Sequence, residues 1–340
     1  MPPANRQVIL KRRPVGEPKE TDFELRESPV PAPADGQALC RTVWLSLDPY
    51  MRGRMSEGPS YAAPVPLGGV MCGGTVSRVE ESKNPALSPG DFVLGYDGWQ
   101  EWAVADAAGL RKLDPEAAPL SYALGVLGMP GMTAYVALLD VGRPKEGETV
   151  VVSAAAGAVG SVAGQIAKLR GCRAVGVAGS DAKCEYVTKE LGFDACLDHR
   201  EAELGARLAQ ACPRGIDVYF ESVGGAVFEA VLPLLNPRAR VPVCGLIALY
   251  DLEAGAAAGG ASAAQLERVL LTRRIRMQGF IIFDDYGPRF GEFREAMGGW
   301  LREGRIKYRE DIAEGLENAP AAFIAMLEGG NFGKQIVQVA

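Results

Sequence analysis

The chain has 340 residues, of which 48% are hydrophobic, and a formal net charge of −6. This length allows two ordinary domains with full cores, and the modest negative charge argues against nucleic acid as the main partner. No apolar run approaches the length of a membrane span, and residues 1–14 lack the apolar core of a signal peptide. We therefore expect a cytoplasmic protein with no membrane partner.

The numbers and spacing of cysteine and histidine limit which metal sites and catalytic nucleophiles the chain can form. The seven cysteines are scattered and form no Cys-x-x-Cys pair, so buried free thiols are expected. His199 is the single histidine. One histidine excludes a His-rich zinc site and argues against a Ser-His or Cys-His nucleophile.

The first part of the chain, up to about Leu127, predicts short strands interrupted by proline and glycine. The expected strands are residues 7–10, 38–44, 73–79, 91–95 and 99–105. Many short strands with turn signals at close spacing are typical of a partly open β-barrel. We expect residues 1–127 to form such a domain.

From Gly128 onward, helical and strand patterns alternate. Strands are expected from Thr149 and Ala174, and at residues 195–198, 216–220, 240–244 and 277–282. Helices are expected at residues 130–139, from Val159, and at 182–191, 204–211, 228–235, 263–271 and 290–303. Six strands joined by crossover helices predict a doubly wound parallel sheet, the Rossmann fold, over residues 128–304. The tail, with strands at 306–312 and 335–339 around a helix at 320–327, is expected to rejoin the first domain, giving it residues 305–340 as well.

The segment 148–180 carries the clearest ligand signal. A β-branched run at residues 149–152 leads into a turn with Ala154, Gly157 and Gly160, and a helical pattern and second strand follow. Small residues let the backbone approach a pyrophosphate, and the helix N-terminus offers free N–H groups. The glycine pattern alone is weak evidence, and a tight turn without a ligand is the alternative.

The end of the second strand indicates which dinucleotide would bind. An NAD site usually has an acidic residue there, to accept from the ribose 2′-hydroxyl. This chain has Gly179 and Ser180, followed by Asp181 and Lys183. A cation without the acid favours a 2′-phosphate, hence NADP. Lys183 could instead be a solvated residue, and Asp181 could be the N-cap of the next helix.

Several further motifs carry a family resemblance. They are residues 45–53 (LSLDPYMRG), 128–135 (GMPGMTAY), 154–160, 178–183, 223–225 (VGG), 244–247 and 331–334 (NFGK). With the order of barrel and Rossmann domain, they resemble the zinc-independent branch of the medium-chain dehydrogenase/reductase superfamily. That branch contains leukotriene B4 dehydrogenases (prostaglandin reductases), plant alkenal double-bond reductases and bacterial curcumin reductases.

The resemblance argues against a bound metal. The zinc enzymes of the superfamily have Gly-His-Glu-x-x-Gly in the barrel domain. The corresponding residues here include Gly69 and Val70 in place of the His and Glu, and no other ligand set has zinc-like spacing. We therefore expect chemistry that hydride donation and hydrogen bonding can carry.

The resemblance implies an NADPH-dependent oxidoreductase acting on a CH–CH group. In this branch a hydride adds to the β-carbon of an α,β-unsaturated ketone or aldehyde, and hydrogen bonds hold the resulting enolate. Tyr50 and Tyr250 are the expected catalytic phenols, although either could be a packing aromatic of the cleft wall or a surface tyrosine.

The resemblance also implies a cofactor site. Gly157, Ala158, Val159 and Gly160 would bind the pyrophosphate, and Ser180 and Lys183 the 2′-phosphate end. Met129 and Thr133 would lie near the carboxamide. The other residues expected around the cofactor are Ser222, Cys244, Gly245, Ile247, Phe280, Ile282 and Asn331. Arg52 could be a second anchor for an anion, or a solvated surface residue.

Two positions depart from the branch. His199 stands where the branch usually has a tyrosine stacking near the adenosine, and Ser222 stands where it has asparagine. Histidine can stack as well, so these changes would affect affinity rather than reaction type. The glycine- and alanine-rich segment 252–264 is expected to cover the substrate pocket.

Two other functions remain open at this stage. A quinone reductase shares the fold and the cofactor, and a non-catalytic NADPH-binding protein would retain the glycine turn. We also expect a homodimer, because the strand at 277–282 would be an edge able to pair with a second copy.

Overall fold

The computed structural model describes residues 4–58, 60–252 and 263–340. The chain forms two compact units, one of Met1–Gly125 with Glu310–Ala340 and the other of Val126–Arg309. The segment expected to cover the substrate pocket falls mostly on residues 253–262, outside the described residues. No helix in the described part of the chain has both the length and the hydrophobicity to cross a bilayer.

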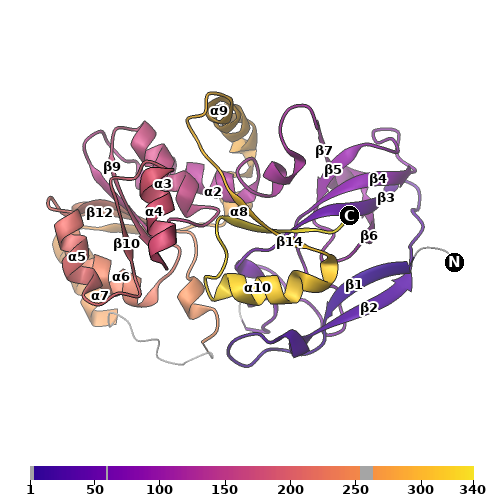
Figure 1. Ribbon diagram of the computed structural model, residues 1–340, viewed down its shortest axis with the longest axis horizontal. Helices are drawn as coiled ribbons and strands as arrows, with labels where there is room; N and C mark the ends of the chain where they lie inside the picture. Colours follow the sequence, from indigo (N-terminus) through magenta and orange to yellow (C-terminus); the bar gives the residue numbers. More distant parts are fainter. Residues whose placement is uncertain (1–3, 59, 253–262) are drawn as a thin grey trace. The chain divides into compact units, whose positions relative to one another are not determined.

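The second unit is built on a six-stranded parallel sheet (Figure 1). From edge to edge the strands are β10 (Ala195–Asp198), β9 (Arg173–Ala178), β8 (Thr149–Val152), β11 (Ile216–Phe220), β12 (Leu235–Val243) and β13 (Arg276–Gly279). The order reverses between β8 and β11, as in a doubly wound dinucleotide fold. The predicted α/β class and doubly wound sheet are confirmed, and β13 is an edge strand.

Helices cover both faces of this sheet. They are α2 (Met129–Val136), α3 (Gly160–Leu169), α4 (Asp181–Lys189), α5 (Leu204–Ala211), α6 (Gly225–Val231), α7 (Ala263–Arg273), α8 (Ile282–Tyr286) and α9 (Phe290–Arg302). In Figure 1, α5, α6 and α7 group on one side of the strands, and α3 and α4 lie on the other. Burial on both faces agrees with β8 being buried at every position, with three consecutive valines and no alternation.

Helix α3 shows why the chain folds this way locally. Val162 and Ile166 are fully buried one turn apart, which fixes the helix on the sheet. Gly171 then takes a φ of +73°, a left-handed conformation that ends the helix at little cost. This ending agrees with the sequence prediction, and it turns the chain directly into β9.

Several element boundaries were predicted wrongly, and the strand expected at 240–244 begins five residues earlier, at Leu235. The helix expected at 228–235 begins earlier, at Gly225, and Pro233 converts its end to a 3-10 turn. The strand expected at 277–282 ends at Gly279, and Ile282 begins α8. The strand expected at 306–312 is instead β14 (Glu310–Glu314).

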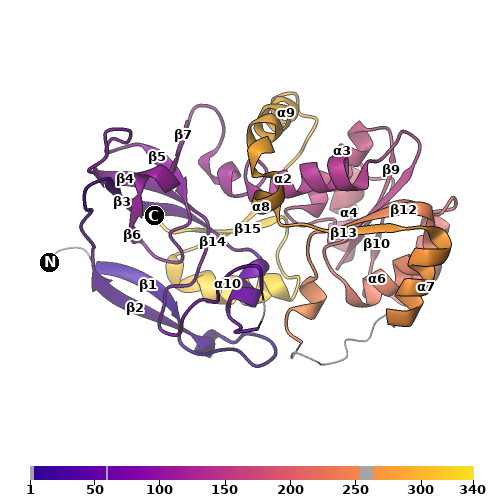
Figure 2. The ribbon, with the colours of Figure 1, turned by 180° about the vertical axis from the view of Figure 1, so that it is seen from behind.

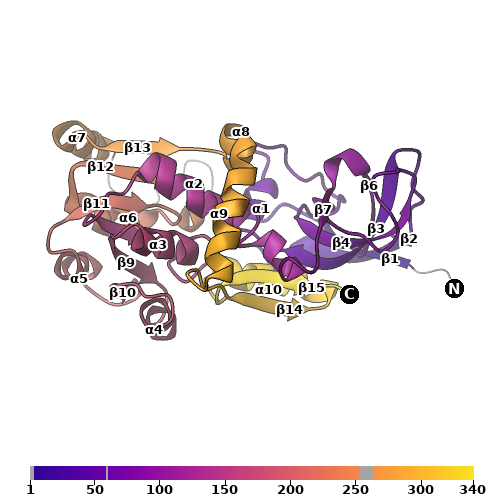
Figure 3. The ribbon, with the colours of Figure 1, turned by 90° about the horizontal axis from the view of Figure 1, so that it is seen from above.

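The first unit has a seven-stranded, mostly antiparallel sheet and a two-stranded ribbon (Figure 2). The sheet contains β14, β15 (Lys334–Gln338), β3 (Gln37–Ser46), β4 (Thr75–Ser82), β5 (Phe92–Gly95), β6 (Trp102–Asp106) and β7 (Arg111–Leu113). The ribbon is β1 (Ala4–Leu10) with β2 (Phe23–Pro29). The helices are α1 (Tyr50–Arg54) and α10 (Ala319–Leu327), and α10 lies along β15 (Figure 3).

Residues from both ends of the chain share the core of this first unit. Phe23, Trp99 and Phe323 pack against one another with ring centroids 5.5 to 6.4 Å apart. The segment after Arg309 adds β15 to the ladder of β3, where Ile336 pairs with Ser46. The tail is therefore part of the sheet that carries α1.

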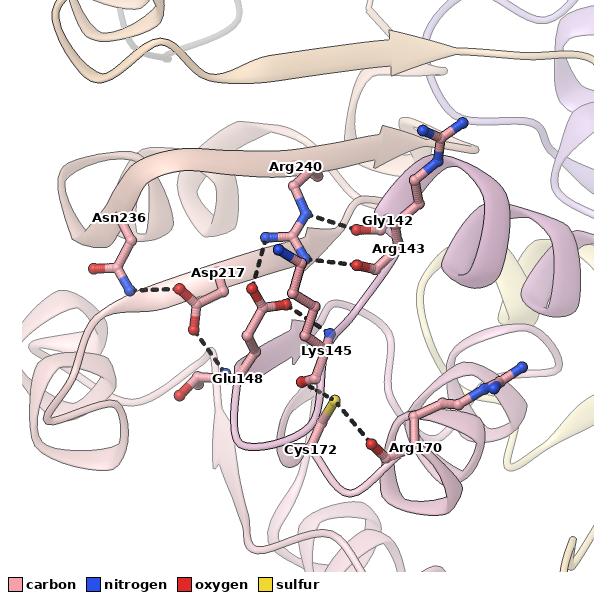
Figure 4. Close-up of polar contacts among 10 residues, drawn as sticks. Gly142, Arg143, Lys145, Glu148, Arg170, Cys172, Asp217, Asn236 and Arg240 are labelled. Carbon is pink, nitrogen blue, oxygen red and sulfur yellow. Dashed lines mark hydrogen bonds and ion pairs between the residues drawn. The ribbon is translucent and has the colours of Figure 1, made fainter.

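In the second unit, a network of ion pairs and hydrogen bonds connects β12 with the segment that precedes β8 (Figure 4). The Arg240 guanidinium donates to the carbonyls of Gly142 and Arg143, at 2.7 and 2.9 Å, and to both oxygens of Glu148. Glu148 also accepts from the amide of Lys145 at 2.8 Å. Burial alone would raise the pKa of Glu148, but the bonds from Arg240 and Lys145 outweigh it and lower that pKa. Arg240 thus ties β12 to the segment that enters β8.

Candidate functional site

The turn after β8 forms a cradle of the kind that holds a phosphate. Ala154 has a φ of +48°, and the amide of Gly157 donates back to the Ala154 carbonyl at 2.9 Å. A Cβ on Gly160 would lie 2.3 Å from that carbonyl oxygen, so only glycine fits where α3 begins. The backbone amides of Ala158, Val159 and Gly160 donate no hydrogen bond to any of the described residues. Three amides at the start of a ten-residue helix suit a pyrophosphate.

The end of β9 leads directly into a serine-capped helix. The Ser180 hydroxyl accepts from the Lys183 amide at 3.3 Å and caps α4. Ser180 is therefore the N-cap, and the alternative that Asp181 fills that position is wrong. The cap fixes the first turn of α4, which carries Lys183.

Two basic side chains, those of His199 and Arg200, lie beside this cap. His199 Nε2 and the Arg200 guanidinium lie 3.1 and 3.7 Å from the position of a Cβ on Gly179. Burial lowers the pKa of His199, and the charges of Arg200 and Lys183 lower it further, against Asp198. His199 is thus kept largely neutral, which suits stacking. The chemistry of this end of the sheet, cationic and capped by a hydroxyl, fits a phosphate on the adenosine ribose.

A buried carboxylate organises the ends of the central strands. Glu221 is 0% exposed, and its Oε1 accepts from the amides of Val223 and Gly224 at 2.7 and 3.0 Å. Tyr219 and Ser153 donate to the same oxygen at 3.1 and 3.4 Å. Burial raises the pKa of Glu221 against these bonds. The carboxyl therefore fixes the Gly224 turn, where φ is +77°.

Ser222 and Cys244 meet at the ends of β11 and β12. The Ser222 hydroxyl and the Cys244 sulfur are 3.1 Å apart, and the Ser222 amide donates to Ser153 Oγ at 2.8 Å. Burial raises the pKa of the Cys244 thiol to about 12, so it stays protonated. The Ser222 hydroxyl is therefore held by the Cys244 thiol. These bonds join the ends of β8, β11 and β12 into one edge.

Tyr250 lies on the same edge. Its hydroxyl accepts from the Leu246 amide at 3.4 Å and lies 3.5 Å from the position of a Cβ on Gly245. Burial raises its pKa, so the phenol keeps its proton. Ile247 begins the 3-10 turn that leads to this tyrosine.

The remaining candidates of this unit are placed as follows. Met129 begins α2 and is half-buried, and the Thr133 hydroxyl donates to the Met129 carbonyl at 2.8 Å. Phe280 follows β13 and packs edge-on against Tyr286, with centroids 6.1 Å apart. Ile282 is buried at the start of α8. Neither Phe280 nor Ile282 lies in a strand, contrary to the prediction.

In the first unit, Tyr50 is the first residue of α1. Its ring packs against the core cluster that contains Leu47 and Met51. Burial, and next the charge of Asp48, raise its pKa well above the ordinary value. Tyr50 is therefore held as a neutral phenol that can donate a hydrogen bond.

Two further candidates in this unit, Asn331 and Arg52, differ in burial and in their hydrogen-bond partners. The Asn331 side chain donates to the Gly333 carbonyl at 2.8 Å and stays half-buried before β15. Arg52 is only 3% exposed and donates to Ser56 Oγ and the Gly16 carbonyl, each at 2.8 Å. The alternative that Arg52 is a solvated surface residue is wrong.

Comparison with known proteins places these features in a family. Residues 6–113 match a family model described as the N-terminal domain of oxidoreductase, and residues 158–300 match one described as zinc-binding dehydrogenase. The NADPH-dependent curcumin reductase of Escherichia coli is 55% identical over 336 residues, covering 99% of this chain and 97% of that protein. The 2-alkenal reductase (NADP⁺-dependent) of Nicotiana tabacum is 41% identical, covering 99% and 98%.

A solved structure agrees closely as well. CurA from Vibrio vulnificus, crystallised in complex with NADPH, is 54% identical, with a TM-score of 0.95 and 98% and 99% of the two chains covered. This chain belongs to the zinc-independent branch of the medium-chain dehydrogenase/reductase superfamily. It is an oxidoreductase of the group of curcumin, alkenal and prostaglandin reductases.

This member of the medium-chain family has no room for the usual zinc ligand. Gly69 closes a turn in which its amide donates to the Pro66 carbonyl at 2.9 Å, and a Cβ there would lie 2.8 Å from the Pro66 ring. A histidine at this position would collide with that turn. The described residues contain no group of three or more His, Cys, Asp or Glu able to hold a metal ion.

Some side chains that matter in this family member were missed by sequence reasoning. Glu221, Ser153 and Arg200 join the site through contacts between strand ends that are distant in sequence. An acidic residue two positions before the Val-Gly-Gly motif was the available signal for Glu221. Nothing in the local sequence marks Ser153, whose role depends on β8 and β11 being neighbours. The cysteine prediction was partly wrong, since three of the seven free thiols are buried and four are partly exposed.

Proposed function

We propose that this protein reduces the C=C bond of α,β-unsaturated ketones and aldehydes with NADPH. The NADPH-dependent reductase group follows from the family, and the C=C substrate is our proposal. The observation that supports it best is that Tyr50, in the first unit, and Tyr250, in the second, are each a half-buried phenol whose raised pKa keeps it protonated. Neutral donors without a general base suit a reaction that develops an enolate oxygen.

The residues of the chain divide the work in this proposal. The amides of residues 158–160 hold the pyrophosphate, and Ser180, Lys183 and Arg200 hold the 2′-phosphate end. NADPH, when bound, supplies the hydride. A phenol, that of Tyr50 or that of Tyr250, donates a hydrogen bond to the carbonyl oxygen as negative charge builds there, which lowers the barrier to hydride addition at the β-carbon. A proton from solvent then adds at the α-carbon, so that the products are the saturated carbonyl compound and NADP⁺.

A substrate panel tests the function directly. We expect NADPH oxidation to depend strictly on an added enone or enal, and the product to be the saturated carbonyl compound by mass spectrometry. Faster turnover of quinones than of any enone would favour the quinone reductase. NADPH binding without turnover of any acceptor would favour a non-catalytic protein.

The phenols predict a specific pH dependence. Because burial raises the pKa of Tyr50 and Tyr250, loss of the donor proton moves above the ordinary tyrosine value of 10.0. We expect kcat for enone reduction to show no tyrosine-dependent fall up to pH 10. The profile is measured for the wild type, Tyr50→Phe and Tyr250→Phe. An alkaline limb below pH 10 that disappears in either variant would contradict the assignment.

Lys183 is proposed to select the phosphorylated coenzyme. In Lys183→Ala we expect the KM for NADPH to rise by about 10- to 30-fold, the size of a lost charge-assisted hydrogen bond. The KM for NADH should change less than about twofold, because NADH lacks the 2′-phosphate. The helix cap survives, since it uses the Lys183 backbone amide. Lys189→Ala, at the exposed end of the same helix, is the matched control, and equal rises for both coenzymes would exclude the assignment.

We also propose a homodimer in the cytoplasm. Among the described strands of this sheet, β13 lies at an edge and offers unpaired backbone groups; Met277 in β13 and Leu271 in α7 are 37% and 79% exposed. Seven free thiols suit a reducing compartment. Analytical ultracentrifugation tests the dimer, with Met277→Lys expected to shift the equilibrium toward monomer, and a monomeric wild type would exclude it.

A further inference from the structure

We propose that Lys334 is a positioning residue that fixes the turn carrying Tyr50 for the reduction, an inference that rests on the proposed function. Lys334 is the first residue of β15 and is only 1% exposed. Its ammonium donates to the Leu47 carbonyl at 2.7 Å and to the Gln335 carbonyl at 2.8 Å. Asp48 Oδ1 lies 3.1 Å away. Three acceptors thus match the three donors of an ammonium.

These contacts reach Tyr50 through a short, rigid path. The other oxygen of Asp48 accepts from the Ser46 hydroxyl, so the carboxylate is held on both sides. The Asp48 carbonyl accepts from the Met51 amide at 3.1 Å, inside the first turn of α1. Pro49, between Asp48 and Tyr50, has a φ of −57° and little freedom to change it. The direction of the Tyr50 side chain therefore depends on where Lys334 holds Leu47 and Asp48.

Stability alone does not account for a lysine at this position. Burial lowers the pKa of Lys334 even though Asp48 opposes that shift, so the ammonium is desolvated at a cost. Glu310 pairs with Lys334 in the β14–β15 ladder, and its own carboxyl pKa is raised by burial. An apolar side chain of similar volume would often serve the core as well as a buried ion pair. What an apolar side chain cannot do is fix two backbone carbonyls and a carboxylate in one geometry.

Lys334 also directly follows the loop that carries Asn331, the other candidate site residue at this end of the chain. Gly333 directly precedes it with a φ of +94°, and the Gly333 carbonyl accepts from Asn331. The Asn331 loop therefore ends at Lys334, and the Tyr50 turn, 281 residues before Asn331 in the chain, is bonded to the same lysine through Leu47 and Asp48. A shift of about 1 Å at such a point can lower a rate by about 100-fold.

The first test compares Lys334→Met, which keeps the length and removes the donors, with Lys112→Met. Lys112 lies in the same unit, its side chain is 58% exposed in an ion pair with Asp91, and it serves as the matched control. We expect kcat for enone reduction to fall by about tenfold or more in Lys334→Met, with the KM for NADPH changed less than about threefold. Hydrogen–deuterium exchange should increase in peptides covering residues 48–54, and not in those covering residues 149–152.

A double-mutant cycle decides whether Lys334 acts through Tyr50. In a Tyr50→Phe background, Lys334→Met should lower kcat by less than about twofold, because the group it positions is already gone. A full tenfold fall in that background would overturn the proposal. So would a lower melting temperature with unchanged kcat and unchanged exchange at residues 48–54, which is the result of a purely structural role.

Two provisions keep the test decisive. If Lys334→Met does not fold, Asp48→Asn with Lys334→Met removes both charges, and the same loss of kcat is expected because the Leu47 carbonyl still lacks its donor. If the wild type reduces no enone, the proposed function fails, whereas the exchange at residues 48–54 still reports on Lys334. No increase there in either variant would refute the positioning role independently of any assay of turnover.

Discussion

Replacing Gly160 by alanine is expected to cost this protein both its stability and its coenzyme. The new methyl group would lie 2.3 Å from the Ala154 carbonyl oxygen and 3.0 Å from that of Ser153. Both are backbone atoms, so relief requires the turn itself to move. Overpacking of this kind costs roughly 1–3 kcal/mol or more, against a gain of about 1 kcal/mol in helix propensity from glycine to alanine. We expect a net loss of about 2 kcal/mol in the free energy of unfolding.

The expected loss of NADPH affinity is larger than the expected loss of stability. A turn that moves away from Ala154 carries the amides of residues 158–160 with it, and these are the proposed pyrophosphate donors. We expect the Kd for NADPH to rise by at least about 100-fold, the loss of two hydrogen bonds to a charged group. Urea unfolding and quenching of intrinsic fluorescence by NADPH measure the two effects.

A second glycine provides the control for Gly160. Gly299 lies inside α9, and a Cβ there would meet nothing within 4 Å. Gly299→Ala should therefore stabilise the protein by about 0.5–1 kcal/mol and leave NADPH binding unchanged. If Gly160→Ala behaved like Gly299→Ala, the close approach at the start of α3 would be refuted.

Removing the Arg240 guanidinium is the second change with a large expected effect. In Arg240→Met, the carbonyls of Gly142 and Arg143 and the Glu148 carboxylate lose their common donor. The Arg240 and Glu148 side chains are only 16% and 21% exposed, so solvent replaces these bonds poorly. Leaving one partner of a buried pair uncompensated costs about 3–5 kcal/mol, and residual exposure favours the lower end. Thermal and urea unfolding should show a loss of about 3 kcal/mol.

The pH dependence of this loss identifies its origin. The folded pKa of Glu148 is lowered from its ordinary value of 4.5, so the pair contributes its full stability above that pH. Its contribution disappears as pH falls through the lower folded value. The difference between wild type and Arg240→Met should therefore shrink below about pH 4.

The control pair is Lys189 with Glu185, whose side chains are 71% and 61% exposed. Lys189→Met should leave the urea midpoint essentially unchanged at neutral pH, because solvent screens this pair. An Arg240→Met loss as small as that, or one that persists unchanged in acid, would mean that the network in Figure 4 contributes little to stability.

The sequence by itself determined the class of fold and its order along the chain. The β-branched run of β8, the small residues of the following turn and Gly171 each specify a local conformation, so the strand, turn and helix could be predicted from neighbours in sequence. The loss of an acid after β9, with Lys183 nearby, pointed to the phosphorylated coenzyme for the same local reason. Boundaries failed where a proline or glycine competed with the hydrophobic period, as at Pro233 and Gly279.

Only the tertiary structure decided which distant groups meet. Glu221 and Ser153 come together because β8 and β11 are adjacent. Arg240 on β12 reaches Glu148, the residue before β8, because only β11 separates these two strands. Lys334 reads as one more charged residue near the end of the chain until β15 joins β3 and buries it beside Asp48. Desolvation and hydrogen bonding depend on such long-range contacts, and short-range sequence patterns contain no information about them.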